Sequence, residues 1–201
     1  MIAVTSRKLC GRPLPDQVAL VADAGPELII LREKDLGHAE LLALASECLA
    51  ACRSRGVPMS VNTDVSAARE LRIPNVHLPL AAMRTADVSG LTVGVSVHSA
   101  EEAVEAEALG ADYLVAGHVF PTACKIGEPR GTGFLRSVCD AVSIPVYAIG
   151  GVNPDNYGRV LEAGAAGGAA MSSVMADDPS EAVRGMPATG CGIRLRLRKG
   201  N

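Results

Sequence analysis

The chain has 201 residues, of which 48% are hydrophobic, and a formal net charge of -3 at pH 7. This length and apolar content suit a large buried core, and the charge argues against a general nucleic-acid-binding protein, because affinity for the phosphate backbone depends on clustered Lys and Arg. No stretch approaches the length of a membrane span, and Arg7 and Lys8 interrupt the first apolar residues, so neither a membrane anchor nor a signal peptide is expected. We therefore expect a cytoplasmic protein that acts on small molecules.

Short apolar runs alternate with amphipathic stretches along most of the chain. The expected strands are 2–4, 28–31, 58–61, 76–78, 93–95, 113–115, 146–149 and 168–171. Helix signals stand between them: Ser99 with Glu102 matches a capping box, and Asn153 followed by Pro154 is typical of a helix start. Eight β/α units in a chain of this length favour an α/β fold of the (β/α)8 TIM-barrel type, with a doubly wound open sheet as the alternative.

The barrel is expected to occupy residues 1–185 as a single domain, followed by a basic C-terminal tail over residues 186–201. Residues 193–199 of this tail alternate between apolar and basic side chains with a period of two. That pattern also fits an added strand or a nucleic-acid-binding tail. We interpret the tail as a frayed, solvated and at least partly disordered terminus.

The active site of a TIM barrel is built from the loops at the C-terminal ends of the strands, so polar residues that follow the expected strands should meet there. Arg32 and Lys34 alternate along an extended segment, which points them to the same side and Glu33 to the other. The alternative is that the charged residues of this segment only form ion pairs with one another in a loop. The residues expected to bind substrate are Arg32, Lys34, Asn62, Ser96, Thr122 and Lys125.

Two pairs of small residues follow the last two expected strands. Gly150 with Gly151 and Ser172 with Ser173 stand where barrels commonly hold a phosphate group. Glycine lets the backbone approach an anion closely, and serine adds hydroxyl donors. The alternative is that the glycines only turn the chain out of the strand. We expect these four residues to bind phosphate.

His118 stands where an expected strand ends, ahead of a turn-rich segment that contains Thr122 and Lys125. An imidazole with a reference pKa of ~6.5 beside an anion-binding loop suits proton transfer. A partly buried His that makes one hydrogen bond and does no chemistry is the alternative. We expect His118 to be the catalytic residue, and His77 and His98 are weaker candidates.

Several motifs follow one another over nearly the whole chain. They are Leu31-Arg32-Glu33-Lys34, Val61-Asn62, Val76-His77-Leu78, Gly94-Val95-Ser96-Val97-His98, Gly110-Ala111-Asp112-Tyr113, Phe120-Pro121-Thr122, Lys125, Ala148-Ile149-Gly150-Gly151 and Gly164-Ala165-Ala166-Gly167. In this order and spacing they resemble the thiamin phosphate synthase/TenI superfamily. The resemblance implies a TIM barrel that acts on a phosphorylated thiazole in thiamin biosynthesis.

Three positions depart from the synthase branch of this superfamily. That branch typically has Gln before Leu-Arg-Glu-Lys, and it has Asp residues that hold Mg²⁺ after the Asn of the third strand and the His-Leu of the fourth. Here Ile30, Thr63 and Ala82 stand at those positions, and Asp64, one residue further along, is a single carboxylate. Because a hard cation is held chiefly by carboxylate oxygens, we expect neither a metal site nor a cofactor.

The segment Gly117-His118-Val119-Phe120, with Cys124 and Lys125 after it, is similar to the TenI branch, whose members are thiazole tautomerases with a catalytic His at this position. The resemblance implies an isomerase in which His118 moves a proton from the ring carbon bearing a carboxylate to an exocyclic carbon, which makes the ring aromatic. We therefore expect a thiazole tautomerase. The alternatives are a thiamin phosphate synthase, which joins a pyrimidine diphosphate to thiazole phosphate, and a non-catalytic regulatory protein that binds thiazole phosphate.

The expected partner is a small phosphorylated thiazole, with no nucleic acid and no membrane involved. Small barrels often pair, so a homodimer stays open. Cys48 and Cys52 lie one helical turn apart, but no His or second Cys pair stands at ligand spacing. We expect both thiols to pack in the core.

Overall fold

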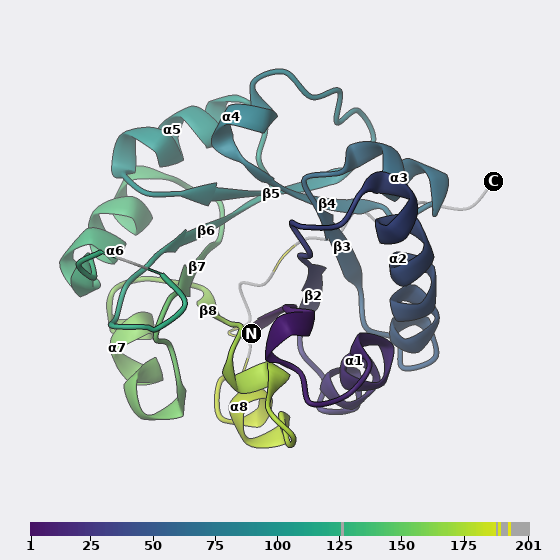
Figure 1. Ribbon diagram of the computed structural model, residues 1–201. Coiled ribbons are helices and arrows are strands. Elements are labelled where there is room, and N and C mark those ends of the chain that lie inside the picture. Colours follow the sequence, from purple (N-terminus) through teal and green to yellow (C-terminus); the bar gives the residue numbers. More distant parts are fainter. Residues whose placement is uncertain (126, 188, 190–192, 194–201) are drawn as a thin grey trace.

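In the described part of the chain, eight parallel strands form a closed barrel in the order β1 to β8 in the computed structural model (Figure 1). The structure describes residues 1–125, 127–187, 189 and 193. Each strand pairs with the next one along the chain, and β8 returns to β1, where Ile2 pairs with Ala169 and Ala3 with Ala170. This closure confirms the predicted (β/α)8 TIM barrel and excludes the open sheet.

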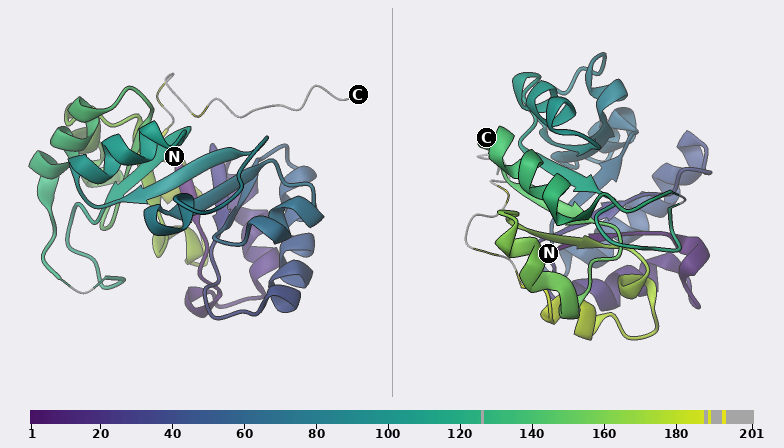
Figure 2. Two further views of the ribbon diagram at one scale, coloured as in Figure 1. Left: turned by 90° about the horizontal axis from the view of Figure 1, so that it is seen from above. Right: turned by 90° about the vertical axis from the view of Figure 1, so that its left-hand side faces the viewer.

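The strands alternate with helices along the chain. The strands are β1 (Ile2–Val4), β2 (Leu28–Leu31), β3 (Met59–Asn62), β4 (Asn75–Pro79), β5 (Thr92–Val97), β6 (Tyr113–Gly117), β7 (Val146–Ile149) and β8 (Gly167–Ala170). The helices are α1 (Leu14–Asp23), α2 (His38–Arg53), α3 (Val65–Glu70), α4 (Leu80–Met83), α5 (Ala100–Ala108), α6 (Gly131–Ala141), α7 (Tyr157–Glu162) and α8 (Ser180–Arg184), with short 3-10 helices η1 (Arg7–Leu9), η2 (Pro154–Asn156) and η3 (Ser173–Met175). The helices succeed one another around the outside of the ring (Figures 1 and 2).

Two apolar clusters hold the barrel together. The larger one lies between the strands and the surrounding helices, where alternate strand residues meet helix faces, as in α1 and α2. The smaller one fills the barrel interior and includes Tyr113 and Tyr147, whose rings meet edge to face with centroids 6.1 Å apart. Because the strands are covered on both sides, they are rich in small and branched aliphatic residues, as parallel sheets require.

The expected strands agree with the observed ones to within two residues at each end. The helix signals also hold locally: the Ser99 hydroxyl accepts a hydrogen bond from the N–H of Glu102 at the start of α5, and Asn153 caps η2 before α7. Most of the predicted basic tail lies outside the described residues. None of the helices in the described ranges has both the length and the apolar character needed to span a bilayer.

Candidate active site at the C-terminal ends of the strands

A cavity of about 490 Å³ opens at the C-terminal ends of the barrel strands. This volume lies within the range of small-molecule sites. All eleven residues predicted for catalysis, substrate binding or phosphate binding line it: Arg32, Lys34, Asn62, Ser96, His118, Thr122, Lys125, Gly150, Gly151, Ser172 and Ser173. The barrel therefore brings together, in one place, residues that are spread over more than half of the chain.

Positive charge gathers on one part of the cavity wall. Arg32 and Lys34 follow β2 and Lys125 belongs to the loop after β6, and all three line the cavity. The charge of Arg32, then burial, then the charge of Lys125 lower the pKa of Lys34. No Asp or Glu is among the described residues that line the cavity. The wall therefore carries uncompensated positive charge and favours an anionic ligand.

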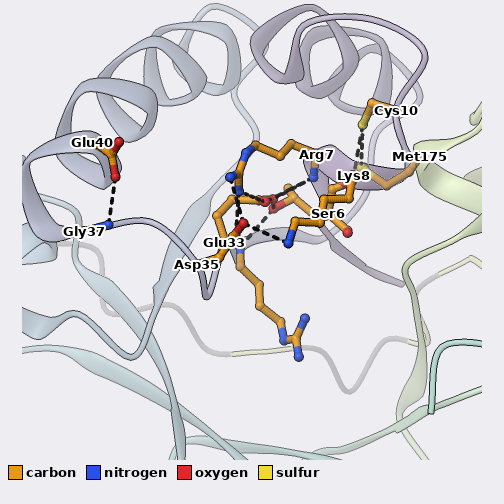
Figure 3. Close-up of polar contacts among 11 residues, drawn as sticks. Ser6, Arg7, Lys8, Cys10, Glu33, Asp35, Gly37, Glu40 and Met175 are labelled. Atoms are coloured by element: carbon orange, nitrogen blue, oxygen red, sulfur yellow. Dashed lines mark hydrogen bonds and ion pairs between the residues drawn. The ribbon is translucent and has the colours of Figure 1, made fainter. Parts of the chain in front are cut away.

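Glu33 points away from the cavity and anchors the loop that carries Arg32 and Lys34. Its nearly buried carboxylate accepts hydrogen bonds from the Thr5 hydroxyl at 2.8 Å and from the Arg7 backbone N–H at 3.0 Å, and it pairs with the Arg7 guanidinium at 3.2 Å (Figure 3). The Thr5 hydroxyl in turn accepts from the N–H of Arg32 at 2.9 Å. The opposite orientations predicted from strand alternation are confirmed.

The network of ion pairs around Glu33 extends to the exposed Asp35. The Arg7 guanidinium pairs with the Asp35 carboxylate at 2.7 Å, and the Lys8 ammonium reaches the same carboxylate at 2.9 Å (Figure 3). Hydrogen bonds from Arg7 and then Lys8 hold the pKa of Asp35 far below its usual range. Glu33 and Asp35 therefore have their ion-pair partners in Arg7 and Lys8. Arg32 and Lys34, from the same segment, face the cavity.

The glycines after β7 let the β6 and β7 loops approach each other. Gly150 has a φ of 94°, and a Cβ at this position would lie 2.2 Å from the Cβ of His118. Gly151 has a φ of 65°, and its Cβ would lie 2.4 Å from the carbonyl oxygen of Pro121. Backbone hydrogen bonds from Val119 to Ile149 and from Phe120 to Gly150, both 2.9 Å, join the loops. Gly150 and Gly151 thus line the cavity, and they also shape the wall that holds His118.

His118 is buried in the cavity wall with 6% of its surface exposed. Its Nε2 lies 3.1 Å from the carbonyl oxygen of Gly127, and its buried Nδ1 has no hydrogen-bond partner among the described residues. His118 lines the cavity, and its unpaired Nδ1 is buried in the wall, where unpartnered polar atoms are rare.

A second histidine lies deeper in the barrel. The Nε2 of His77 is 2.8 Å from the Ser96 hydroxyl, and its Nδ1 is 3.4 Å from the hydroxyl of Tyr113. Burial, followed by the charge of Arg32, lowers the pKa of His77 to about 3. The ring is therefore neutral near pH 7 and fixes the Ser96 hydroxyl at the cavity floor. Sequence reasoning ranked His77 low and missed this contact, which only the neighbouring positions of β4 and β5 reveal.

The donor set does not suit a carboxylate-held Mg²⁺. Thr63 lines the cavity but offers a hydroxyl, and Ala82 lies in α4 and offers no ligand atom. Asp64 caps α3: its carboxylate accepts from the N–H of Ala67 at 2.9 Å and lies 2.6 Å from the Nδ1 of His38. The described residues include no cluster of three or more His, Cys, Asp or Glu side chains placed to hold a metal. A hard cation prefers several oxygen ligands, and this wall does not supply them.

Comparison with known proteins places this geometry in context. A family model described as thiamine monophosphate synthase matches residues 1–174. Over 158 residues the chain is 42% identical to the thiamine-phosphate synthase of Methanospirillum hungatei, a match that covers 75% of this chain and 77% of that protein. A solved structure of thiamine phosphate pyrophosphorylase from Pyrococcus furiosus superposes with a TM-score of 0.80 at 34% identity, over 92% of this chain and 91% of the other.

Some relatives are longer than this chain. A rice protein named probable thiamine biosynthetic bifunctional enzyme, chloroplastic, is 36% identical over 181 residues, which are 86% of this chain and 33% of that protein. The chain therefore spans about a third of that relative's length.

The predicted thiazole tautomerase, and with it the isomerase class, is wrong. Several relatives, including that of Methanospirillum hungatei, are named thiamine-phosphate synthase, which is a transferase, and the similar solved structure is a pyrophosphorylase. The prediction gave most weight to the short segment around His118 and to the missing Asp residues at positions 63 and 82. The chain has no carboxylate at these two positions, but its cavity keeps the three cations Arg32, Lys34 and Lys125.

The family match over residues 1–174 covers most of the chain, and the Methanospirillum hungatei relative aligns with 75% of it. The cavity contains the three cations and the Gly and Ser residues that follow β7 and β8. It opens on a barrel that is similar to the Pyrococcus furiosus structure. The chain belongs to the thiamine monophosphate synthase family.

Proposed function

We propose that this chain is a thiamine-phosphate synthase: a transferase that joins a thiazole phosphate to a pyrimidine carrying a diphosphate and releases pyrophosphate. In this reaction the thiazole ring nitrogen supplies an electron pair to the pyrimidine's methylene carbon. A C–N bond forms, the C–O bond to the diphosphate breaks, and its electron pair leaves with pyrophosphate. Both substrates are phosphorylated, so the site must hold two anionic groups at once.

The observation that carries the proposal is that one cavity is lined both by a cluster of cations and by a separate set of Gly and Ser residues. The cation cluster of Arg32, Lys34 and Lys125 suits the more highly charged diphosphate. The small residues after β7 and β8 suit a single phosphate, because they offer backbone N–H groups and hydroxyls at close range: Gly150, Gly151, Ser172 and Ser173. A tautomerase substrate of the kind described above carries a carboxylate as its second anionic group, which calls for less positive charge than a diphosphate does.

The remaining cavity residues are proposed to position the two rings. C–N bond formation itself requires no proton transfer, so His118, which lines the cavity, is proposed to pack against a substrate ring. Ser96, fixed by the neutral His77, and Asn62 and Thr122 would supply further polar contacts. Excluding water from this pocket would protect the diphosphate-bearing carbon from hydrolysis.

The test is to incubate the purified chain with thiazole phosphate and the pyrimidine diphosphate and to quantify thiamin phosphate and pyrophosphate. The two products are expected in equal amounts. Lys125→Met should raise KM for the pyrimidine diphosphate on the order of tenfold or more, because a charge-assisted contact is lost. Arg84→Met is the control, because Arg84 pairs with Glu105 at the surface, 2.6 Å away. This variant should leave KM unchanged. Tight binding of thiazole phosphate without product would contradict the proposal and support a non-catalytic binding protein.

A further inference from the structure

The cation cluster and Thr63, one of the two positions that lack a carboxylate, line the same cavity. Thr63 lines the cavity beside Asn62, near the cations that follow β2, and it adopts a φ of 71°. The carboxylate nearest in sequence, Asp64, is committed to the N-terminus of α3, to Ser66 and to His38. The position where this family's synthases place a metal ligand therefore carries a neutral hydroxyl, and the neighbouring acid has other partners.

The cations are free to meet a ligand. In the described residues, the basic side chains near this loop that form ion pairs are Arg7 and Lys8, which bind Glu33 and Asp35, whereas no ion pair joins Arg32, Lys34 or Lys125 to an acid. Mutual repulsion among like charges that share a wall destabilises the empty pocket and is relieved when an anion enters. A diphosphate carries more negative charge than one phosphate, so it relieves more of this repulsion.

From these two observations we infer that the pocket binds the diphosphate group without a carboxylate-held divalent cation, and that Arg32, Lys34 and Lys125 neutralise the leaving pyrophosphate in its place. This inference rests on the proposed function, because the diphosphate is the substrate named there. Lysine and arginine clamps stabilise negative charge as it develops on a departing group, which is the task a metal ion performs elsewhere. Atoms and electrons balance as in the transfer above, and no co-reactant is added.

The test is calorimetric titration of the full chain with inorganic pyrophosphate, once in EDTA and once in excess Mg²⁺ at matched ionic strength. The Kd in EDTA is expected to equal the Kd in Mg²⁺ or to be lower, because Mg²⁺ in solution competes with the protein for pyrophosphate. A Kd that is lower in Mg²⁺ by more than about threefold, or binding that requires Mg²⁺, would overturn the inference.

Two variants sharpen the test. Arg32→Met should weaken binding in EDTA by about 10- to 100-fold, whereas the surface variant Arg84→Met should leave the Kd unchanged. Thr63→Asp places a carboxylate on the wall at a left-handed position that Asp tolerates. Pyrophosphate binding by this variant should weaken in EDTA and recover in Mg²⁺, and an unchanged Kd in EDTA would show that position 63 does not face the diphosphate.

The inference and the proposed function fail in different ways. If pyrophosphate binds equally well in EDTA but the two substrates yield no thiamin phosphate, the function is wrong and the metal-free anion site stands. If thiamin phosphate forms only with Mg²⁺ and pyrophosphate binding follows the same dependence, the function stands and the inference is overturned.

Discussion

At the scale of single residues, the cavity residues are held in position by side chains that point away from the cavity. Glu33 is the clearest case: it contacts no part of the cavity, yet it ties the backbone of Arg7 and the hydroxyl of Thr5 to the loop that carries Arg32 and Lys34. Strand alternation predicts that Glu33 points outward. It does not identify Thr5 and Arg7 as its partners, because they belong to the segment after β1, where Thr5 follows the strand and Arg7 begins η1.

Replacing Glu33 should affect stability and one substrate in particular. Glu33→Ala leaves the buried Thr5 hydroxyl and the Arg7 N–H without their acceptor, so urea denaturation should show a loss of about 1–3 kcal/mol in the free energy of unfolding. KM for the pyrimidine diphosphate should rise more than KM for thiazole phosphate, because the loop of Arg32 and Lys34 loses its anchor. Asp35→Ala, which breaks only exposed pairs, should cost less than about 1 kcal/mol. Equal losses in the two variants would contradict this role.

His77 should make stability depend on pH. Burial lowers its pKa in the folded chain to about 3 from the ordinary value of 6.5, so the unfolded chain takes up a proton below pH 6.5 that the folded chain does not. The free energy of unfolding should therefore fall as the pH decreases from 6.5 towards 3, by at most about 1.4 kcal/mol per pH unit from this group. Denaturation at several pH values, compared with His77→Gln, isolates the effect. A variant that keeps the full slope would contradict the assignment.

At the scale of elements, the barrel joins loops that are distant in sequence. The loops after β6 and β7 are in such close contact at Gly150 that any side chain there would meet His118. The sequence predicts the strands and the polar residues at their ends well, because the apolar runs and turn signals are local. It leaves open whether Gly150 and Gly151 serve the turn or the ligand, since both need glycine, and the structure shows that close packing is one of their tasks.

Gly150→Ala tests this packing against a matched control. Gly110 has a similar φ of 91° but no atom near its would-be Cβ, whereas Gly150 has a φ of 94° and the Cβ of His118 at 2.2 Å. Gly110→Ala should cost about 1–2 kcal/mol from backbone strain alone. Gly150→Ala should cost about 1–3 kcal/mol more, because overpacking adds to the strain. Urea denaturation of both variants measures the loss in the free energy of unfolding. Equal losses would show that the loops after β6 and β7 separate freely.

At the scale of the whole molecule, the fold follows from the sequence more directly than the reaction does. Eight β/α units in one chain leave few topologies, and the superfamily motifs follow the same order, so the barrel and the eleven cavity residues could be predicted. The reaction could not, because the prediction of a tautomerase rested on a few side chains, Thr63, Ala82 and His118, whose chemistry depends on their neighbours in space. The sequence predicts that the three cations meet at the site, but only the structure shows that no described Asp or Glu lines the cavity with them.

The proposed arrangement of two anion sites in one cavity can be tested directly by a crystal structure of the chain with thiazole phosphate and pyrophosphate bound together. Pyrophosphate is expected on Arg32, Lys34 and Lys125, and the thiazole phosphate group on Gly151, Ser172 and Ser173, with the His118 ring against the thiazole. A single anion bound across both regions, or pyrophosphate bound away from the three cations, would contradict the account.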